Sequence, residues 1–173
     1  MATTILLTRH GETDWNRARR FQGHADTPLN AAGQAQARRL ADALTGERLD
    51  ALYSSDLRRA HETAEIVGEL LRLPITVDPD LREIDVGSWS GLTYDEIGER
   101  AWDGETYEAH AERMLRAVSR IVERHPEGRV AIISHGGSVR RIFEAAQLTE
   151  RPVLENCEIV AFRAEGTVLE LLD

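Results

Sequence analysis

Two histidines in this chain have the same local setting, each between an apolar run and a glycine. His10 lies in the stretch 5–11, Ile-Leu-Leu-Thr-Arg-His-Gly, and His135 lies in the stretch 130–137, Val-Ala-Ile-Ile-Ser-His-Gly-Gly. Short apolar, β-branched runs of this kind predict parallel strands that are buried on both faces. Ligands bind outside the carboxyl ends of such strands. If the two strands are neighbours, both imidazoles reach one ligand-binding edge, and Arg9 beside His10 strengthens the case for chemistry there.

Segments with strand and helix patterns alternate along the rest of the chain. Further strands are expected at 51–55, 75–77, 159–163 and 168–172. Helices are expected at 29–44, 57–71, 106–124 and 139–146, with a short one capped by Thr93 and Glu96. The stretch 81–91 has no clear periodicity and is interpreted as a functional loop. We therefore predict an α/β fold, a three-layer α/β/α sandwich with a mostly parallel central sheet and an antiparallel last pair of strands.

Length and charge limit the class of protein. A chain of 173 residues fits one domain, here 1–173. The net charge of -9 argues against binding to nucleic acid or to an anionic membrane. The first apolar stretch is interrupted too early for a signal peptide, and no run is long enough to span a membrane, so a cytoplasmic location is expected. Cys157 is the only cysteine, which excludes an internal disulfide.

Two histidines and several carboxylates could bind zinc in principle. The chain contains no H-E-x-x-H or H-x-H spacing, however. We therefore expect no metal ion and no cofactor.

Four motifs, in order, carry a resemblance to a known family. They are the R-H-G motif within 7–16, the S-x-x-x-R-A-x-x-T segment at 55–63, the acid-bearing loop at 81–91, and Ser-His-Gly-Gly at 134–137. Together they cover most of the chain. The sequence resembles the histidine phosphatase superfamily, also called the phosphoglycerate mutase-like family, and the resemblance implies that fold.

The resemblance implies a role for each motif. It nominates His10 as the nucleophile that becomes a phosphohistidine. Its attacking nitrogen must be unprotonated, and its other nitrogen needs an acceptor such as a carbonyl next to Gly11. Phosphoryl transfer spreads negative charge over three oxygens, which Arg9, Arg59 and His135 would stabilise, with His135 as a cation or a hydrogen-bond donor. Secondary phosphate contacts are expected from these residues: Asn16, Gln22, Gly23 and Gly136.

Glu83 occupies the family's acid position. It would protonate the departing alcohol oxygen and then activate water, which requires a carboxyl kept partly protonated. Leu81 and Ile84 predict an apolar setting for it. The aromatic residues Trp89, Tyr94, Trp102 and Tyr107 are expected at the rim of the pocket or packed against it.

Helical spacing separates Arg59 from its neighbour independently of the motif. Arg58 has Glu62 at i,i+4 and belongs to a solvated, charged stripe. Arg59 lies on the flank of the apolar stripe. The other arginine pairs, 19–20, 38–39 and 140–141, are interpreted as solvated faces, and His110 and His125 as surface residues of a helix.

These expectations lead to a metal-independent phosphoric monoester hydrolase acting on a small phosphate ester, either α-ribazole phosphatase-like or broad in specificity. The first alternative is a cofactor-dependent phosphoglycerate mutase, although the short stretch 92–107 favours the phosphatase branch. The second alternative is a non-catalytic phosphate-binding regulatory module. The sequence selects no physiological substrate, and it leaves monomer and homodimer open, because the last strands could leave an exposed edge.

Overall fold

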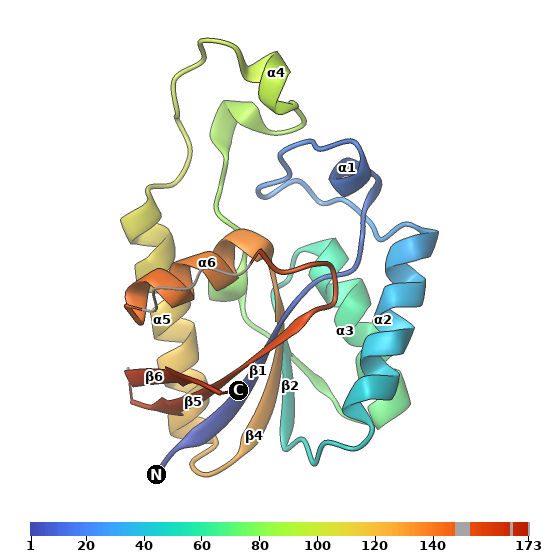
Figure 1. Ribbon diagram of the computed structural model, residues 1–173, viewed down its shortest axis with the longest axis vertical. Helices are drawn as coiled ribbons and strands as arrows, with labels where there is room; N and C mark the ends of the chain where they lie inside the picture. Colours follow the sequence, from blue (N-terminus) through green and yellow to red (C-terminus); the bar gives the residue numbers. More distant parts are fainter. Residues whose placement is uncertain (148–152, 167, 173) are drawn as a thin grey trace.

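A six-stranded sheet forms the centre of the protein, as the computed structural model in Figure 1 shows. The structure describes residues 1–147, 153–166 and 168–172. The strands are β1 (Thr3–Arg9), β2 (Ala51–Ser54), β3 (Ile75–Val77), β4 (Arg129–Ser134), β5 (Ile159–Glu165) and β6 (Val168–Leu171). The helices are α1 (Asp14–Arg17), α2 (Ala31–Leu44), α3 (Arg58–Leu71), α4 (Tyr94–Ile97), α5 (Tyr107–Arg124) and α6 (Gly136–Ala145), with 3-10 turns η1 (Pro79–Leu81) and η2 (Gly87–Trp89).

The strand order is β3-β2-β4-β1-β5-β6. The pairs β1–β4, β2–β4 and β2–β3 are parallel, whereas β5 runs antiparallel to β1 and β6 antiparallel to β5. The expected mostly parallel sheet with an antiparallel last pair is therefore confirmed.

Side-chain alternation along the central strands divides the core into two layers. Ile5 and Leu7 of β1 pack in one apolar cluster with α5 and α6, and Leu6 packs in the other with α2 and α3. Successive residues of a strand point to opposite faces, so one buried strand supplies both clusters. In Figure 1, α5 and α6 lie on one face of the sheet and α2 and α3 on the other. The three-layer sandwich is thus confirmed.

Local capping explains where α2, α4 and α5 begin. The side chain of Asn30 accepts the amide of Gly33 at the start of α2, and Thr106 caps α5 in the same way. Thr93 and Glu96 form the expected capping box at α4. Each side chain satisfies a backbone donor that the first helical turn leaves free.

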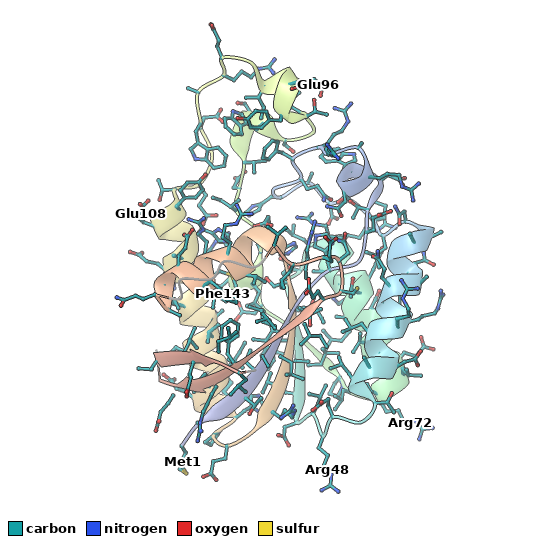
Figure 2. The ribbon with its side chains drawn as sticks, viewed as in Figure 1. Met1, Arg48, Arg72, Glu96, Glu108 and Phe143 are labelled. Atoms are coloured by element: carbon teal, nitrogen blue, oxygen red, sulfur yellow. The ribbon has the colours of Figure 1, made fainter. Side chains whose placement is uncertain are left out.

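The carboxyl ends of β1 and β4 lie side by side. Their register pairs Arg9 with Ser134, so His10 and His135 both follow at the same edge of the sheet. Figure 2 shows Glu96 of α4 at one end of the molecule and Met1 and Arg48 at the other. The segment around α4 therefore stands beyond the strand ends that carry the histidines. Among the described residues, no helix has the length and apolar character that crossing a membrane requires.

Candidate active site

His10 lies at the end of β1 with its ring held in one orientation. The residue is 3 % exposed, and its backbone amide donates to the carbonyl of Ser134. Nδ1 lies 2.6 Å from the carbonyl oxygen of Gly11. Because a carbonyl can only accept, Nδ1 carries the proton and Nε2 keeps a lone pair. The acceptor next to Gly11 that the sequence predicted is present.

Arg59 of α3 contacts the free nitrogen of His10. Its Nε donates to Nε2 of His10 at 3.2 Å, and its two terminal nitrogens donate to the carbonyls of Gly23 and Ala25 at 2.8 and 2.9 Å. Burial lowers the pKa of Arg59 to about 10, so the guanidinium stays charged at neutral pH. Arg58 instead forms an exposed ion pair with Glu62. The separation of Arg58 from Arg59 by helical spacing is confirmed.

Burial and nearby positive charge affect the protonation of His10. Burial is the largest cause that holds the pKa of His10 well below its ordinary 6.5, and the charge of Arg59 acts in the same direction. The imidazole is therefore neutral at neutral pH, as a nitrogen nucleophile must be.

His135 follows β4 and is fully buried beside His10. The two ring centroids are 5.3 Å apart, with the ring planes tilted by 59°. Nε2 of His135 lies 2.7 Å from Oγ of Ser55, and Nδ1 has no hydrogen-bond partner among the described residues. Burial, followed by the charge of Arg59, holds the pKa of His135 well below 6.5. Of the two roles expected for it, the neutral hydrogen-bond donor fits this environment better than the cation.

Arg9 has a buried donor that is not in use. Its Nη1 donates to the carbonyl of Leu154 at 2.7 Å, while its buried Nε has no partner in the described part of the chain. Gly136 begins α6 close by, and a Cβ there would lie 3.4 Å from Nε of Arg9. The N-terminus of a helix and a free guanidinium N–H at one place favour an anion.

Asn16 and Gln22 are held by their amide oxygens. Oδ1 of Asn16 accepts from the backbone N–H of Thr13 at 3.0 Å. Oε1 of Gln22 accepts from the hydroxyls of Thr13 and Thr27 at 2.9 and 2.5 Å. With both oxygens occupied, each side chain has its NH₂ group available to donate. Both residues line the cavity described below, as does Gly23.

Glu83 has a more polar setting than the sequence predicted. Its Oε1 accepts from the amide of Ile84, and its Oε2 accepts from the amide of Gly137, both at 2.9 Å. The expected apolar environment of this carboxyl is therefore wrong: the first turn of α6 lies against it and supplies a donor. A Cβ on Gly137 would lie only 2.3 Å from Oε1, so only a glycine lets α6 approach this closely.

Arg113 of α5 positions the backbone around Glu83, a role that no sequence motif indicated. Its guanidinium donates to the carbonyls of Asp80, Arg82 and Glu83 at 2.9, 2.6 and 2.7 Å. Glu105 holds the same guanidinium at 2.7 Å. In the sequence, Glu105 and Arg113 are related only by their i,i+8 spacing. That spacing does not predict which loop Arg113 contacts.

These side chains surround a cavity of about 540 Å³ at the end of the sheet. The candidate site residues that line it are Arg9, His10, Asn16, Gln22, Gly23, Arg59, Glu83 and Gly136. His135 is not among its lining residues; it contacts the His10 ring instead. Trp89, Tyr94, Trp102 and Tyr107 also line the cavity, as expected of them.

Two other expectations were wrong in part. The arginines at 19, 38, 39 and 140 are exposed, as expected of solvated faces. Arg20 and Arg141 are half-buried, however, and both line the cavity together with Arg140. His110 has no exposed surface, because its position on α5 turns toward α6, where it meets Ser138. His125 ends α5 and is partly buried against the hydroxyl of Tyr53, 2.9 Å from its Nε2.

The arrangement can hold a phosphoryl group and react with it. A neutral imidazole lone pair, the buried guanidinium of Arg59, the half-buried guanidinium of Arg9 and free amide donors meet at the carboxyl ends of adjacent parallel strands. Fixed donors of this kind stabilise the charge that develops on phosphoryl oxygens. Within the described ranges, no group of three or more His, Cys, Asp or Glu side chains could hold a metal ion. Fold and site together define the class of the protein, an α/β phosphatase.

Comparison with known proteins gives the particular family. The model of the histidine phosphatase superfamily (branch 1) matches residues 5–172. Phosphoglycerate mutase-like protein 4 of Arabidopsis thaliana is 36% identical over 180 residues, covering 92% of this chain and 78% of that protein. The metal-independent phosphoserine phosphatase of Arabidopsis thaliana is 37% identical over 160 residues, covering 82% and 67%. The structure of Bacillus stearothermophilus YhfR superposes with a TM-score of 0.90 at 35% identity, covering 98% and 95%. This chain belongs to the histidine phosphatase superfamily.

Proposed function

We propose that this phosphatase hydrolyses small phosphomonoesters without a metal ion, through a phosphohistidine on Nε2 of His10. The observation that carries the proposal is the pair of contacts on the His10 ring. The carbonyl of Gly11 holds the proton on Nδ1, and an arginine N–H lies at the lone pair of Nε2. The nucleophilic nitrogen and a donor for phosphoryl oxygen therefore occupy the same place.

In the first step, Nε2 of His10 attacks phosphorus while the bond from phosphorus to the alcohol oxygen breaks. Arg59 turns its N–H from Nε2 to a phosphoryl oxygen, which frees the lone pair. The unused Nε of Arg9 and the unpartnered Nδ1 of His135 are further donors, provided that the hydroxyl of Ser55 donates to Nε2 of His135. The amide groups of Asn16 and Gln22 are assigned to the remaining oxygens.

Glu83 is assigned the proton transfers. When protonated, it donates to the departing alcohol oxygen, which leaves as a neutral alcohol. The resulting carboxylate takes a proton from water, the water oxygen attacks phosphorus, and the bond from phosphorus to Nε2 breaks. Inorganic phosphate leaves, and both His10 and Glu83 return to their starting states. The two backbone N–H groups on its carboxylate hold Glu83 in position for these transfers.

The alternative activity, a phosphoglycerate mutase, differs only in what receives the phosphoryl group. A mutase returns it to a second hydroxyl of the substrate, whereas a phosphatase gives it to water. The similarity to a phosphoserine phosphatase over 82% of this chain supports the hydrolase. Release of inorganic phosphate, compared with formation of the isomeric ester from 3-phosphoglycerate, separates the two.

The experiment is turnover of para-nitrophenyl phosphate by the full chain and by two histidine variants. His10→Ala should abolish release of nitrophenol while circular dichroism stays unchanged. His61→Ala is the matched control, since His61 lies on α3 and pairs with Glu65 away from the cavity. Activity should persist in a chelator. Full turnover by His10→Ala, or a loss in chelator that added metal reverses, would contradict the proposal.

A further inference from the structure

His110 is a buried histidine that the proposed reaction does not use. It lies on α5 with no exposed surface, yet it lines the cavity together with Glu83 and Tyr107. Its Nε2 lies 3.0 Å from Oγ of Ser138. Its Nδ1 has no hydrogen-bond partner among the described residues.

The contacts of Ser138 determine which nitrogen of His110 carries the proton. The hydroxyl of Ser138 donates to the carbonyl of Arg82 at 3.1 Å. A hydroxyl has one proton, so toward His110 this oxygen can only accept. Nε2 of His110 must therefore be the donor, and Nδ1 is left as an acceptor. Burial lowers the pKa of His110 to about 4, so the ring is neutral at neutral pH and this acceptor persists.

A buried acceptor without a partner is unfavourable, because it has given up its hydrogen bond to water and gained none in return. A donor that enters the cavity can remove this cost. The charges along the cavity indicate which kind of donor is favoured. Arg9, Arg59 and Arg140 form no ion pair among the described residues, and Glu83 is the one carboxylate that lines the cavity in that part of the chain. This balance disfavours an ammonium group and favours a neutral hydroxyl.

We propose that Nδ1 of His110 accepts a hydrogen bond from a hydroxyl on the alcohol part of the substrate. His110 is then a specificity-determining residue, and the substrate class is a phosphate ester of a polyol. The inference rests on the proposed function, because it concerns the alcohol attached to the phosphate that His10 attacks. A substrate without this hydroxyl leaves the acceptor unpaired and binds more weakly.

The test compares two esters of the same chain length, glycerol 1-phosphate and n-propyl phosphate, with phosphoethanolamine as the ammonium analogue. The full chain should prefer glycerol 1-phosphate over n-propyl phosphate by about tenfold in kcat/KM, the factor that one hydrogen bond of about 1.4 kcal/mol supplies. His110→Phe keeps an aromatic ring at this position and removes both nitrogens. This variant should abolish the preference by raising KM for glycerol 1-phosphate. Its kcat/KM values for n-propyl phosphate and para-nitrophenyl phosphate should change less than about twofold.

Two further variants separate specificity from packing. His110→Asn, which returns an amide oxygen near the position of Nδ1, should restore part of the preference. Ser138→Ala removes the acceptor for Nε2, so the proton can move to Nδ1, and it should weaken the preference without removing the ring.

The outcomes distinguish this inference from the proposed function. Equal losses on both esters in His110→Phe would assign His110 a structural role and overturn the inference. A full chain that hydrolyses para-nitrophenyl phosphate but shows no preference for the glycerol ester, or prefers phosphoethanolamine, would overturn the substrate class while leaving the phosphatase intact. No hydrolysis of any ester would instead contradict the proposed function itself.

Discussion

The Nε of Arg59 lies 3.2 Å from Nε2 of His10, and both side chains are almost fully buried. A guanidinium can only donate, so this contact requires an unprotonated Nε2. The same positive charge lowers the pKa of His10, second only to burial. Arg59 thus favours the neutral imidazole, and in the proposed reaction it then donates to a phosphoryl oxygen.

Neighbouring arginines on α3 provide a matched pair of variants. Arg59→Ala should lower kcat/KM by about 100- to 1,000-fold, the usual effect of removing one donor to a developing anion. Arg59→Lys should recover only part of this, because an ammonium lacks the planar fork. Arg58→Ala should keep kcat/KM within about twofold of that of the unaltered chain, since the exposed ion pair of Arg58 with Glu62 contributes little to stability. Steady-state kinetics with para-nitrophenyl phosphate measure kcat/KM for each variant. Equal losses of kcat/KM at positions 58 and 59 would contradict the assignment of Arg59 to the phosphoryl group.

Neighbouring serines at the end of β2 test the orientation of His135. Oγ of Ser55 lies 2.7 Å from Nε2 of His135, whereas Oγ of Ser54 donates to the carbonyl of Ser55. Ser55→Ala should lower kcat by about tenfold or more, because the tautomer of His135 is no longer held. Ser54→Ala should lower stability by about 1 kcal/mol with little change in kcat. Imidazole ¹⁵N shifts would report the tautomer, and an unaltered His135 signal in Ser55→Ala would refute the assignment.

Gly137→Ala should displace the carboxylate of Glu83. The added Cβ would lie 2.3 Å from Oε1 of Glu83, so the hydrogen bond from the Gly137 amide is lost. Turnover of an alkyl phosphate, which needs an acid at its leaving oxygen, should fall by about 100-fold. Turnover of para-nitrophenyl phosphate should fall less, because nitrophenolate leaves without a proton.

Gly46→Ala is the control for that substitution, since no atom lies within 4 Å of a Cβ there. Its turnover of both esters should match that of the unaltered chain. Equal losses on the two esters in Gly137→Ala would show that the substitution disturbs something other than the acid.

Acid should destabilise the fold through its buried histidines. Burial holds the pKa values of His10, His110 and His135 below the ordinary 6.5. Below pH 6.5 the unfolded chain therefore binds protons that the folded chain does not. The free energy of unfolding should fall as the pH falls, by up to about 1.4 kcal/mol per pH unit for each histidine. For His110 this window extends from pH 6.5 to about 4.

Denaturant unfolding at pH 7, 6 and 5 measures this dependence. The variant His110→Phe removes one of the three groups, so its slope between pH 6 and 5 should be smaller by about 1.2 kcal/mol per pH unit, because the unfolded imidazole is only partly protonated at pH 6. An identical slope in the two proteins would mean that His110 takes up its proton in the folded state.

Local pattern was sufficient for the elements and for much of the candidate site. The runs 5–11 and 130–137 predicted two strands, and both form. Helical spacing distinguished Arg59 from Arg58, and Thr93 with Glu96 marked the start of α4. These features depend on residues a few positions apart in the chain. The environment of Glu83 could not be predicted in this way, because the amide that contacts it comes from α6.

By itself, the sequence determined which residues stand at strand ends, which face of each helix is apolar, and which family the motifs resemble. Only the tertiary structure decided that β1 and β4 are neighbours, which nitrogen of His10 is free, and that His110 faces the cavity. Periodicity and capping act over one or two turns of chain. Strand order, the tautomer of a ring and the burial of a helix position depend on contacts between residues far apart in sequence, and those contacts exist only once the sheet and its two helical layers have packed.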